Sequence, residues 1–387
     1  MAYNIFIIVT LCLLGYAVYS IVLNNVAYPK THPKFHSVYG LKDLGYPNFK
    51  CPSETMEPSR KVPNSVHRVK FGDIKVIAAL GDSLTAGSGA GAKKLDGLFH
   101  RYRGLVFDIG GDRSLEEHIT VANVLKKFNP NIHGQSFGID DDFPNSQFNV
   151  AVPGARAEDL VPQAYNLIKL MKNHSDMVDI EKDWKLINIF IGANDACGYC
   201  ATKSSEWGAK VYGNKIREAV KVLKEGLPRT IVSVLAMLNL NVLMKVDPVS
   251  PFCAEAHKMQ CACDTEPPIN VKRLCQEYRQ EVFNIQNLGE FESDDFTFVV
   301  QPTFADVDQP PIDPSGKVDL EFFAPDCFHF SQYGNALVGA FLWNNMVEPV
   351  GKKTTNVTVS NEALRLKCPD VNCPYFRTTK NSKICSI

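Results

Sequence analysis

Apolar runs and amphipathic stretches alternate along most of this chain, as strands and helices alternate in βαβ proteins. Five apolar runs bounded by turn residues predict buried parallel strands. Amphipathic stretches between them carry apolar residues at helical spacing, which predicts packing faces rather than cofactor-binding segments. The runs cover residues 76–80, 147–152, 186–191, 230–238 and 296–300. The pattern predicts one α/β domain with three α/β/α layers over residues 74–350.

Five predicted helices complete these layers. Their apolar stripes are Val121, Val124, Leu125 and Phe128; Leu160, Ala164, Leu167 and Met171; Ile216, Ala219, Val220 and Leu223; Val271, Leu274, Cys275, Tyr278, Val282 and Ile285; and Ala336, Ala340, Trp343 and Val347. Two segments, 90–113 and 246–268, do not fit the alternation. Both follow strand ends, where loops can form the walls of a substrate cleft.

Both ends of the chain differ from the central pattern. Residues 1–23 contain no charged side chain, and an almost continuous apolar run covers 5–19. A run of about 15 apolar residues is shorter than a membrane span and predicts a secretory signal peptide over 1–20. Extension of the run to Leu23 keeps an uncleaved signal anchor as the alternative.

The flanking segments lack lasting periodicity. Residues 21–73 are rich in Pro, Lys and Ser and predict an extended arm, with Cys51 as a point of attachment. Residues 351–387 form a cysteine-containing C-terminal extension without an apolar tail for a span or glycolipid anchor. The expectation is a secreted protein, and acceptor sequons at Asn173 and Asn356 agree with glycosylation in that compartment.

Composition and cysteine content limit the classes of protein to which this chain could belong. The net charge of −1 over 387 residues provides no electrostatic footprint for nucleic acid. Twelve cysteines, or eleven without Cys12 of the leader, allow five disulfides and one unpaired thiol in an oxidising compartment. Their paired spacings also suit zinc or redox chemistry, but a structural zinc site usually needs four ligands in two paired elements. The candidate disulfide cysteines are Cys197, Cys200, Cys261, Cys263 and Cys327.

Ser83 and two later residues are candidates for nucleophilic catalysis. Ser83 follows the first predicted strand in a Gly-Asp-Ser turn, at the sheet edge where α/β proteins bind ligands. Asp326-x-x-His329 provides an imidazole that could accept the serine proton and a carboxylate that could fix its tautomer. Taken singly, the serine motif can be only a turn and the Asp–His pair only a surface pair.

Two other strand ends provide candidates for an oxyanion hole. Gly154 ends the second run, where a backbone N–H can approach a ligand closely, and the Asn194 amide follows the third. Gly154 could equally turn the chain, and Asn194-Asp195 could cap the next helix. Four such features in this order favour one site, in which Ser83 contributes its backbone N–H as well.

These residues resemble, in order, the four sequence blocks of the GDSL or SGNH hydrolases. The blocks are Gly81-Asp82-Ser83-Leu84, Gly154, Gly192-x-Asn194-Asp195 and Asp326-x-x-His329. Longer strings are similar to the membrane-associated phospholipase B branch, from about Cys51 to the end. They include residues 78–87, 102–105, 156–160, Cys197-x-x-Cys200, 323–330 and 343–346.

The resemblance implies a flavodoxin-like SGNH fold with a five-stranded parallel sheet. It further implies Ser83 as nucleophile, His329 as general base and then acid, Asp326 as its partner, and Ser83, Gly154 and Asn194 as oxyanion donors. The implied reaction is hydrolysis of fatty-acyl esters of phospholipids and lysophospholipids at a membrane or micelle surface, without a metal or other cofactor. Members of this branch often carry tandem copies and a C-terminal span, whereas this sequence shows one copy and no such span.

Substrate class rests on the resemblance more than on individual residues. Arg101 and Arg103 are candidates for a lipid phosphate, although a loop arginine is more often solvated. One alternative is a secreted esterase for neutral lipids or acetylated carbohydrates. The other is a non-catalytic binding protein on a hydrolase scaffold.

Overall fold

The structure is a computed structural model that describes residues 40–261, 263, 270–362 and 364–385. The predicted signal peptide over 1–20, the alternative signal anchor and the first part of the predicted arm lie outside the described residues. Within the part of the chain that is described, no helix combines the length and the apolar character of a membrane span.

Four parallel strands form the central sheet, in the order β1-β2-β3-β4. The strands are β1 (Ile74–Gly81), β2 (Trp184–Phe190), β3 (Thr230–Leu235) and β4 (Phe296–Gln301). Almost every residue in them is buried, as expected for a parallel sheet that is covered on both faces. Gly81 at the end of β1 pairs with Phe190 at the end of β2, so the segments that follow these strands leave from the same edge.

The predicted five-stranded sheet is corrected to four strands. Residues 147–152 lie beside β1 at the place of the missing strand but make only an isolated parallel bridge, Ala79 with Asn149. The Val150 N–H donates to the Ala79 carbonyl at 3.0 Å, and the Val152 N–H donates to Gly81 at 3.2 Å. The segment therefore occupies the edge position of a flavodoxin-like sheet without forming a regular strand.

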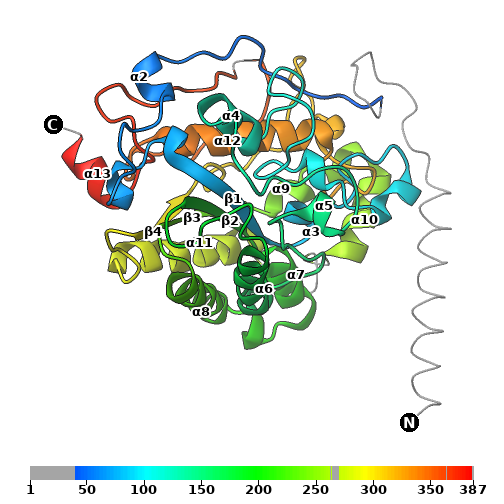
Figure 1. The fold of residues 1–387 in the computed structure, drawn as a ribbon. Helices are drawn as coiled ribbons and strands as arrows, with labels where there is room; N and C mark the ends of the chain where they lie inside the picture. Colours follow the sequence, from blue (N-terminus) through cyan, green and yellow to red (C-terminus); the bar gives the residue numbers. More distant parts are fainter. Residues whose placement is uncertain (1–39, 262, 264–269, 363, 386–387) are drawn as a thin grey trace.

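Five helices form the outer layers (Figure 1). Helices α4 (Val121–Phe128) and α12 (Gln332–Val347) cover one face of the sheet. Helices α6 (Leu160–Asn173), α8 (Ala209–Gly226) and α11 (Val271–Leu288) cover the other face. All five coincide with stripes predicted from the sequence, which confirms the α/β/α layers.

Short helices connect these layers and concentrate on the edge where the strands end. Their bounds are α2 (Ser53–Met56), α3 (Ser83–Ala86), α5 (Phe143–Ser146), α7 (Ala193–Thr202), α9 (Asn241–Met244), α10 (Pro251–Gln260) and α13 (Thr379–Ile384). The segment that was predicted as irregular over 246–268 contains α10. Figure 1 shows α3, α7, α9 and α10 gathered at one side of the molecule, away from α13.

The described flanking segments pack against the sheet domain. Phe71 lies between Phe128 of α4 and Trp343 of α12, with ring centroids 5.8 and 4.7 Å away. Phe376, from the C-terminal extension, contacts the same ring at 5.8 Å. The two flanks therefore complete the core on the α4 and α12 face.

Five disulfides cross-link the described chain, in agreement with the count expected from the sequence. The pairs are Cys51–Cys368, Cys197–Cys261, Cys200–Cys263, Cys253–Cys327 and Cys373–Cys385. The free cysteine among the described residues is the buried Cys275 of α11. Such a disulfide content is typical of a protein that folds in an oxidising compartment.

Candidate active site

Ser83 is held in a tight turn at the carboxyl end of β1. Asp82 caps α3 by accepting a hydrogen bond from the Leu84 N–H at 2.9 Å, so Ser83 is the first residue of this helix. N–H groups in the first turn of a helix have no acceptor within the helix, which leaves the Ser83 N–H available for a ligand. Gly81 makes the turn possible, because a Cβ there would lie 2.5 Å from the Phe190 carbonyl oxygen.

His329 lies between Ser83 and Asp326. Its Nε2 atom is 2.8 Å from Ser83 Oγ, and its Nδ1 atom is 2.5 Å from Asp326 Oδ2. Asp326 Oδ1 accepts hydrogen bonds from the N–H groups of Phe328 and His329 at 3.1 and 3.0 Å. Ser83 and Asp326 are buried, while the His329 side chain is 19% exposed. The structure thus brings together three residues, of which Ser83 and His329 are 246 positions apart in the sequence.

Burial and charge act in opposite directions on the His329 imidazole. Burial disfavours the imidazolium, but the negative charge and hydrogen bond of Asp326 outweigh burial, with a further contribution from Asp82, and raise the pKa of His329. For Asp326, burial acts against ionisation, but His329 and the two backbone N–H groups lower its pKa. Both shifts favour a pair formed by the Asp326 carboxylate and a protonated His329.

The raised pKa of His329 predicts where activity is lost at low pH. In the role of general base that the sequence predicts, His329 must be neutral, so its protonation should remove activity as the pH falls. We expect the acid limb of kcat/KM to lie above the ordinary histidine value of 6.5, because the pKa of His329 is raised. A pH profile with a soluble p-nitrophenyl ester measures this limb. A limb below the ordinary value would contradict the role of Asp326 in stabilising the imidazolium.

Asp82 is a second carboxyl group at the site. It is 1% exposed, and burial raises its pKa to about 7, against the opposing effects of the Leu84 N–H and His329. In the sequence, Asp82 is predicted only as a residue of the turn and of the Gly-Asp-Ser-Leu block. Its position shows that it also contributes to the electrostatic environment of His329.

The predicted oxyanion residues Gly154 and Asn194 lie on neighbouring turns at the same sheet edge. Asn194, the second residue of α7, donates from Nδ2 to the Ala155 carbonyl at 2.9 Å. One hydrogen of the same amide remains for another acceptor. Gly154 has φ +80°, and a Cβ there would meet no atom within 4 Å, so this backbone faces open space. Hydrogen bonding between the two turns fixes their relative positions.

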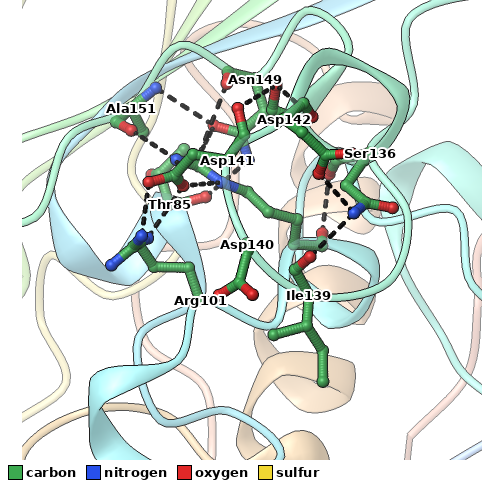
Figure 2. Close-up of polar contacts among 12 residues, drawn as sticks. Thr85, Arg101, Ser136, Ile139, Asp140, Asp141, Asp142, Asn149 and Ala151 are labelled. Carbon is green, nitrogen blue, oxygen red and sulfur yellow. Dashed lines mark hydrogen bonds and ion pairs between the residues drawn. The ribbon is translucent and has the colours of Figure 1, made fainter.

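A buried arginine supports the turn that carries Gly154. Arg103 is 4% exposed and donates from Nη1 to Asn149 Oδ1 at 2.9 Å and from Nη2 to the Ala151 carbonyl at 3.0 Å. Asn149 in turn donates to the Thr85 carbonyl at 2.8 Å, which connects residues 147–152 to α3. Figure 2 shows Asn149, Ala151 and Thr85 in this network. These contacts compensate for the missing regular strand.

Neither arginine suggested for a lipid phosphate is free in this structure. Arg103 Nη2 and Arg101 Nη2 both pair with Asp141, at 2.7 and 2.6 Å (Figure 2). Arg103 is also buried, so it serves the internal network instead. The Arg101 side chain is 30% exposed, but the Asp141 carboxylate already pairs with its charge.

An apolar pocket adjoins the reactive serine and was not visible in the sequence analysis. Leu84, Ala193, Phe328 and Phe330, which are neighbours of the predicted site residues, form its inner end. Its walls include Leu238, Leu240, Val242, Leu243, Phe304 and Val307. The predicted fourth strand extended to Leu238, whereas β3 ends at Leu235. Leu238, the last residue of that apolar run, lies beyond β3 and lines this pocket, so the continuation of the run past the strand was the available signal.

The two sequons lie at accessible positions. Asn173 is the exposed last residue of α6, and Asn356 is exposed in the C-terminal extension. Neither belongs to the Ser83 site. Both remain predicted glycosylation sites.

The fold and the serine, histidine and aspartate geometry define a serine hydrolase of the three-layer α/β/α type. A family model for GDSL-like lipase/acylhydrolase matches residues 77–342. The chain belongs to this family of carboxylic ester hydrolases. All four sequence blocks lie within the matched residues.

Similar proteins include three mammalian phospholipases. The chain is 40% identical over 335 residues to "Phospholipase B1, membrane-associated" of Homo sapiens, which covers 84% of this chain and 22% of the relative. It is 39% and 38% identical over 345 residues to the proteins of that name from Rattus norvegicus and Mus musculus, which covers 87% of this chain and 23% of each relative. The chain thus spans less than a quarter of the length of these relatives.

Proposed function

We propose that this chain hydrolyses fatty-acyl esters of glycerophospholipids and lysophospholipids through an acyl-enzyme on Ser83. The observation that carries the proposal is the hydrogen-bonded series Ser83, His329 and Asp326 beside an apolar pocket. A polar reaction centre next to an apolar channel suits a substrate with a long hydrocarbon chain and an ester. The three phospholipase relatives support the same substrate class.

The proposed first step is attack of Ser83 Oγ on the ester carbonyl carbon. His329 Nε2 accepts the serine proton, and Asp326 stabilises the imidazolium that forms. The N–H groups of Ser83 and Gly154 and the Asn194 amide stabilise the negative oxygen of the tetrahedral intermediate. The carbon–oxygen bond to the alcohol then breaks, and His329 returns the proton to the departing oxygen. Water repeats these steps on the acyl-enzyme and releases the fatty acid.

A phosphatidylcholine with a different acyl chain at each position tests the substrate. We expect wild-type protein to release fatty acid and Ser83→Ala to release none, and the identity of the first acid shows which ester is cleaved first. Short-chain esters cleaved by the wild type without release from the phospholipid would favour an esterase for other acyl esters. Absence of turnover on every ester would leave the binding-protein alternative.

Replacement of Asn194 tests the oxyanion assignment. Asn194→Ala should lower kcat by about 100- to 1,000-fold, because one of the donors to the developing oxyanion is lost. KM should change little, since the ground-state carbonyl gains less from this donor than the transition state does. The rate on a soluble ester and active-site titration measure the effect. A rise in KM with unchanged kcat would instead assign Asn194 to substrate binding.

The half-buried Val242 offers a test of the acyl pocket. Val242→Trp should reduce the pocket and lower kcat/KM for a long-chain ester about tenfold or more relative to butyrate, because several methylenes lose an apolar contact. Val249→Trp is the matched control, since Val249 is 52% exposed and does not line the pocket. Equal chain-length profiles for wild type and Val242→Trp would exclude this pocket as the acyl site.

We also propose that the chain is secreted and glycosylated at Asn173 and Asn356. Its five disulfides and the exposure of both sequons support this location. The alternative to secretion is attachment to a membrane through an uncleaved N-terminal signal anchor.

A further inference from the structure

Helix α10 contacts the turn that carries Asp326 and His329 through one face. Cys253 and His257 are four positions apart in α10, and Gln260 follows three positions later. Residues at this spacing share one side of a helix. All three reach the same short turn, over residues 324–329. The clustering of these contacts points to a common task for this face.

The first contact is covalent. Cys253 forms a disulfide with Cys327, which lies between Asp326 and His329. A single covalent connection fixes the distance between two elements but leaves rotation of the peptide units around it. A second contact is needed to define the orientation of the turn.

His257 provides this second contact. It is 2% exposed, its Nε2 atom is 2.9 Å from the Cys327 carbonyl oxygen, and its Nδ1 atom is 2.5 Å from Asp247 Oδ1. Both partners are acceptors, so each ring nitrogen donates through its own N–H, and the bond to the Asp247 carboxylate orients the ring toward the Cys327 carbonyl. Gln260 adds a longer hydrogen bond, from Nε2 to the Asp326 carbonyl at 3.4 Å.

Cys327 itself needs such support. Its φ is +61°, in the left-handed region that a residue with a side chain seldom adopts. This conformation reverses the chain so that the N–H groups of Phe328 and His329 both donate to Asp326 Oδ1. Relaxation of Cys327 would turn these donors away and release the carboxylate from His329.

We propose that His257 of α10 is a positioning residue for the triad: by donating to the Cys327 carbonyl, it holds Asp326 on His329 Nδ1. This inference rests on the proposed function, since it assigns a task in the same reaction. Disulfides from Cys197 and Cys200 of α7 to Cys261 and Cys263 secure the other end of α10. Because α7 carries Asn194, α10 is linked both to the helix of the predicted oxyanion donor and to the turn of Asp326 and His329.

The chain offers a matched control in a second buried pair of the same design. His118 is fully buried, with Nδ1 2.6 Å from Asp43 Oδ1 and Nε2 2.9 Å from the Leu105 carbonyl oxygen. This pair joins the N-terminal flank to the segment 90–113 and makes no contact with the turn 324–329 among the hydrogen bonds of the described residues. Replacing His118 should therefore destabilise the fold about as much as replacing His257 does, but without the proposed effect on Ser83, His329 and Asp326.

The experiment compares His257→Leu, His257→Gln and His118→Leu by kcat, KM, pH profile and Tm on p-nitrophenyl butyrate. We expect His257→Leu to lower kcat about 10- to 100-fold, the scale of a small misplacement of a catalytic group, with KM within about twofold. Its acid limb should move to lower pH, because His329 loses part of its stabilisation by Asp326. His257→Gln keeps a donor near the Nε2 position and should recover most of kcat.

The His118→Leu control decides whether His257 acts on the triad or only on stability. His118→Leu should lower Tm like His257→Leu but leave kcat and the acid limb as in the wild type. The proposal is overturned if His257→Leu lowers Tm alone, or if both leucine variants change kcat and the limb equally. If the leucine variants do not fold, His257→Asn against His118→Asn gives the same comparison, because the shorter side chain keeps the site polar but does not reach the carbonyl. A wild type that is inactive and unlabelled by a fluorophosphonate would instead refute the proposed function itself.

Discussion

Replacing Ser83 by alanine is expected to lower kcat for ester hydrolysis by roughly 10⁴- to 10⁶-fold, because the acyl-enzyme can no longer form. Ser83 Oγ is the atom that His329 Nε2 approaches, at 2.8 Å. The protein should still fold, since Asp82 and not Ser83 provides the side chain that caps α3. Tm should therefore remain close to that of the wild type while activity disappears.

Ser88 provides the control for this variant. Both serines are 9% exposed and lie within a few residues of each other after β1. Ser88→Ala should keep activity and should still be labelled covalently by a fluorophosphonate. Labelling or phospholipid hydrolysis that persists in Ser83→Ala would assign the nucleophile to another residue.

Changing Asp326 to asparagine should lower kcat by about 10⁴-fold, the effect of presenting the wrong histidine tautomer. The geometry gives the reason. The side-chain oxygen of Asn would stay on the N–H groups of Phe328 and His329, as Asp326 Oδ1 does now. The amide NH₂ would then face His329 Nδ1, so that the ring proton moves to Nε2 and the ring can no longer accept from Ser83.

The pH profile separates this tautomer effect from simple unfolding. Residual activity of Asp326→Asn should have its acid limb at lower pH than the wild type, because the charge that raises the pKa of His329 is gone. Asp43→Asn changes another buried His–Asp pair, with His118, and should keep kcat. A kcat for Asp326→Asn within tenfold of the wild type would remove Asp326 from the catalytic group.

The layers could be predicted because their signal is local. The stripes on α6, α8 and α11 and the apolar runs of β2 and β4 each reveal one element without knowledge of its partners. Residues 147–152 could not be judged in this way. Their apolar pattern is that of a strand, but side-chain hydrogen bonds from Arg103 and Asn149 replace much of the regular pairing.

The reactive residues were predictable for a different reason. Ser83, Asp326 and His329 lie in short motifs whose order and spacing are distinctive, so their meeting in space follows from the family pattern. The apolar pocket has no such motif, because segments on either side of β4 build it together. The internal use of Arg103 was equally hidden, since its partner Asp141 is 38 positions away.

The disulfide between Cys51 and Cys368 makes most of the protein a covalent ring. It joins residues 317 positions apart, and the ring contains all four strands together with Ser83, Asp326 and His329. A single break in an exposed loop would open this ring without separating the reactive groups into different molecules. The Cys51–Cys368 disulfide would thus hold a protein with one nicked loop together. Reduction of the disulfides would then be needed to separate the two fragments.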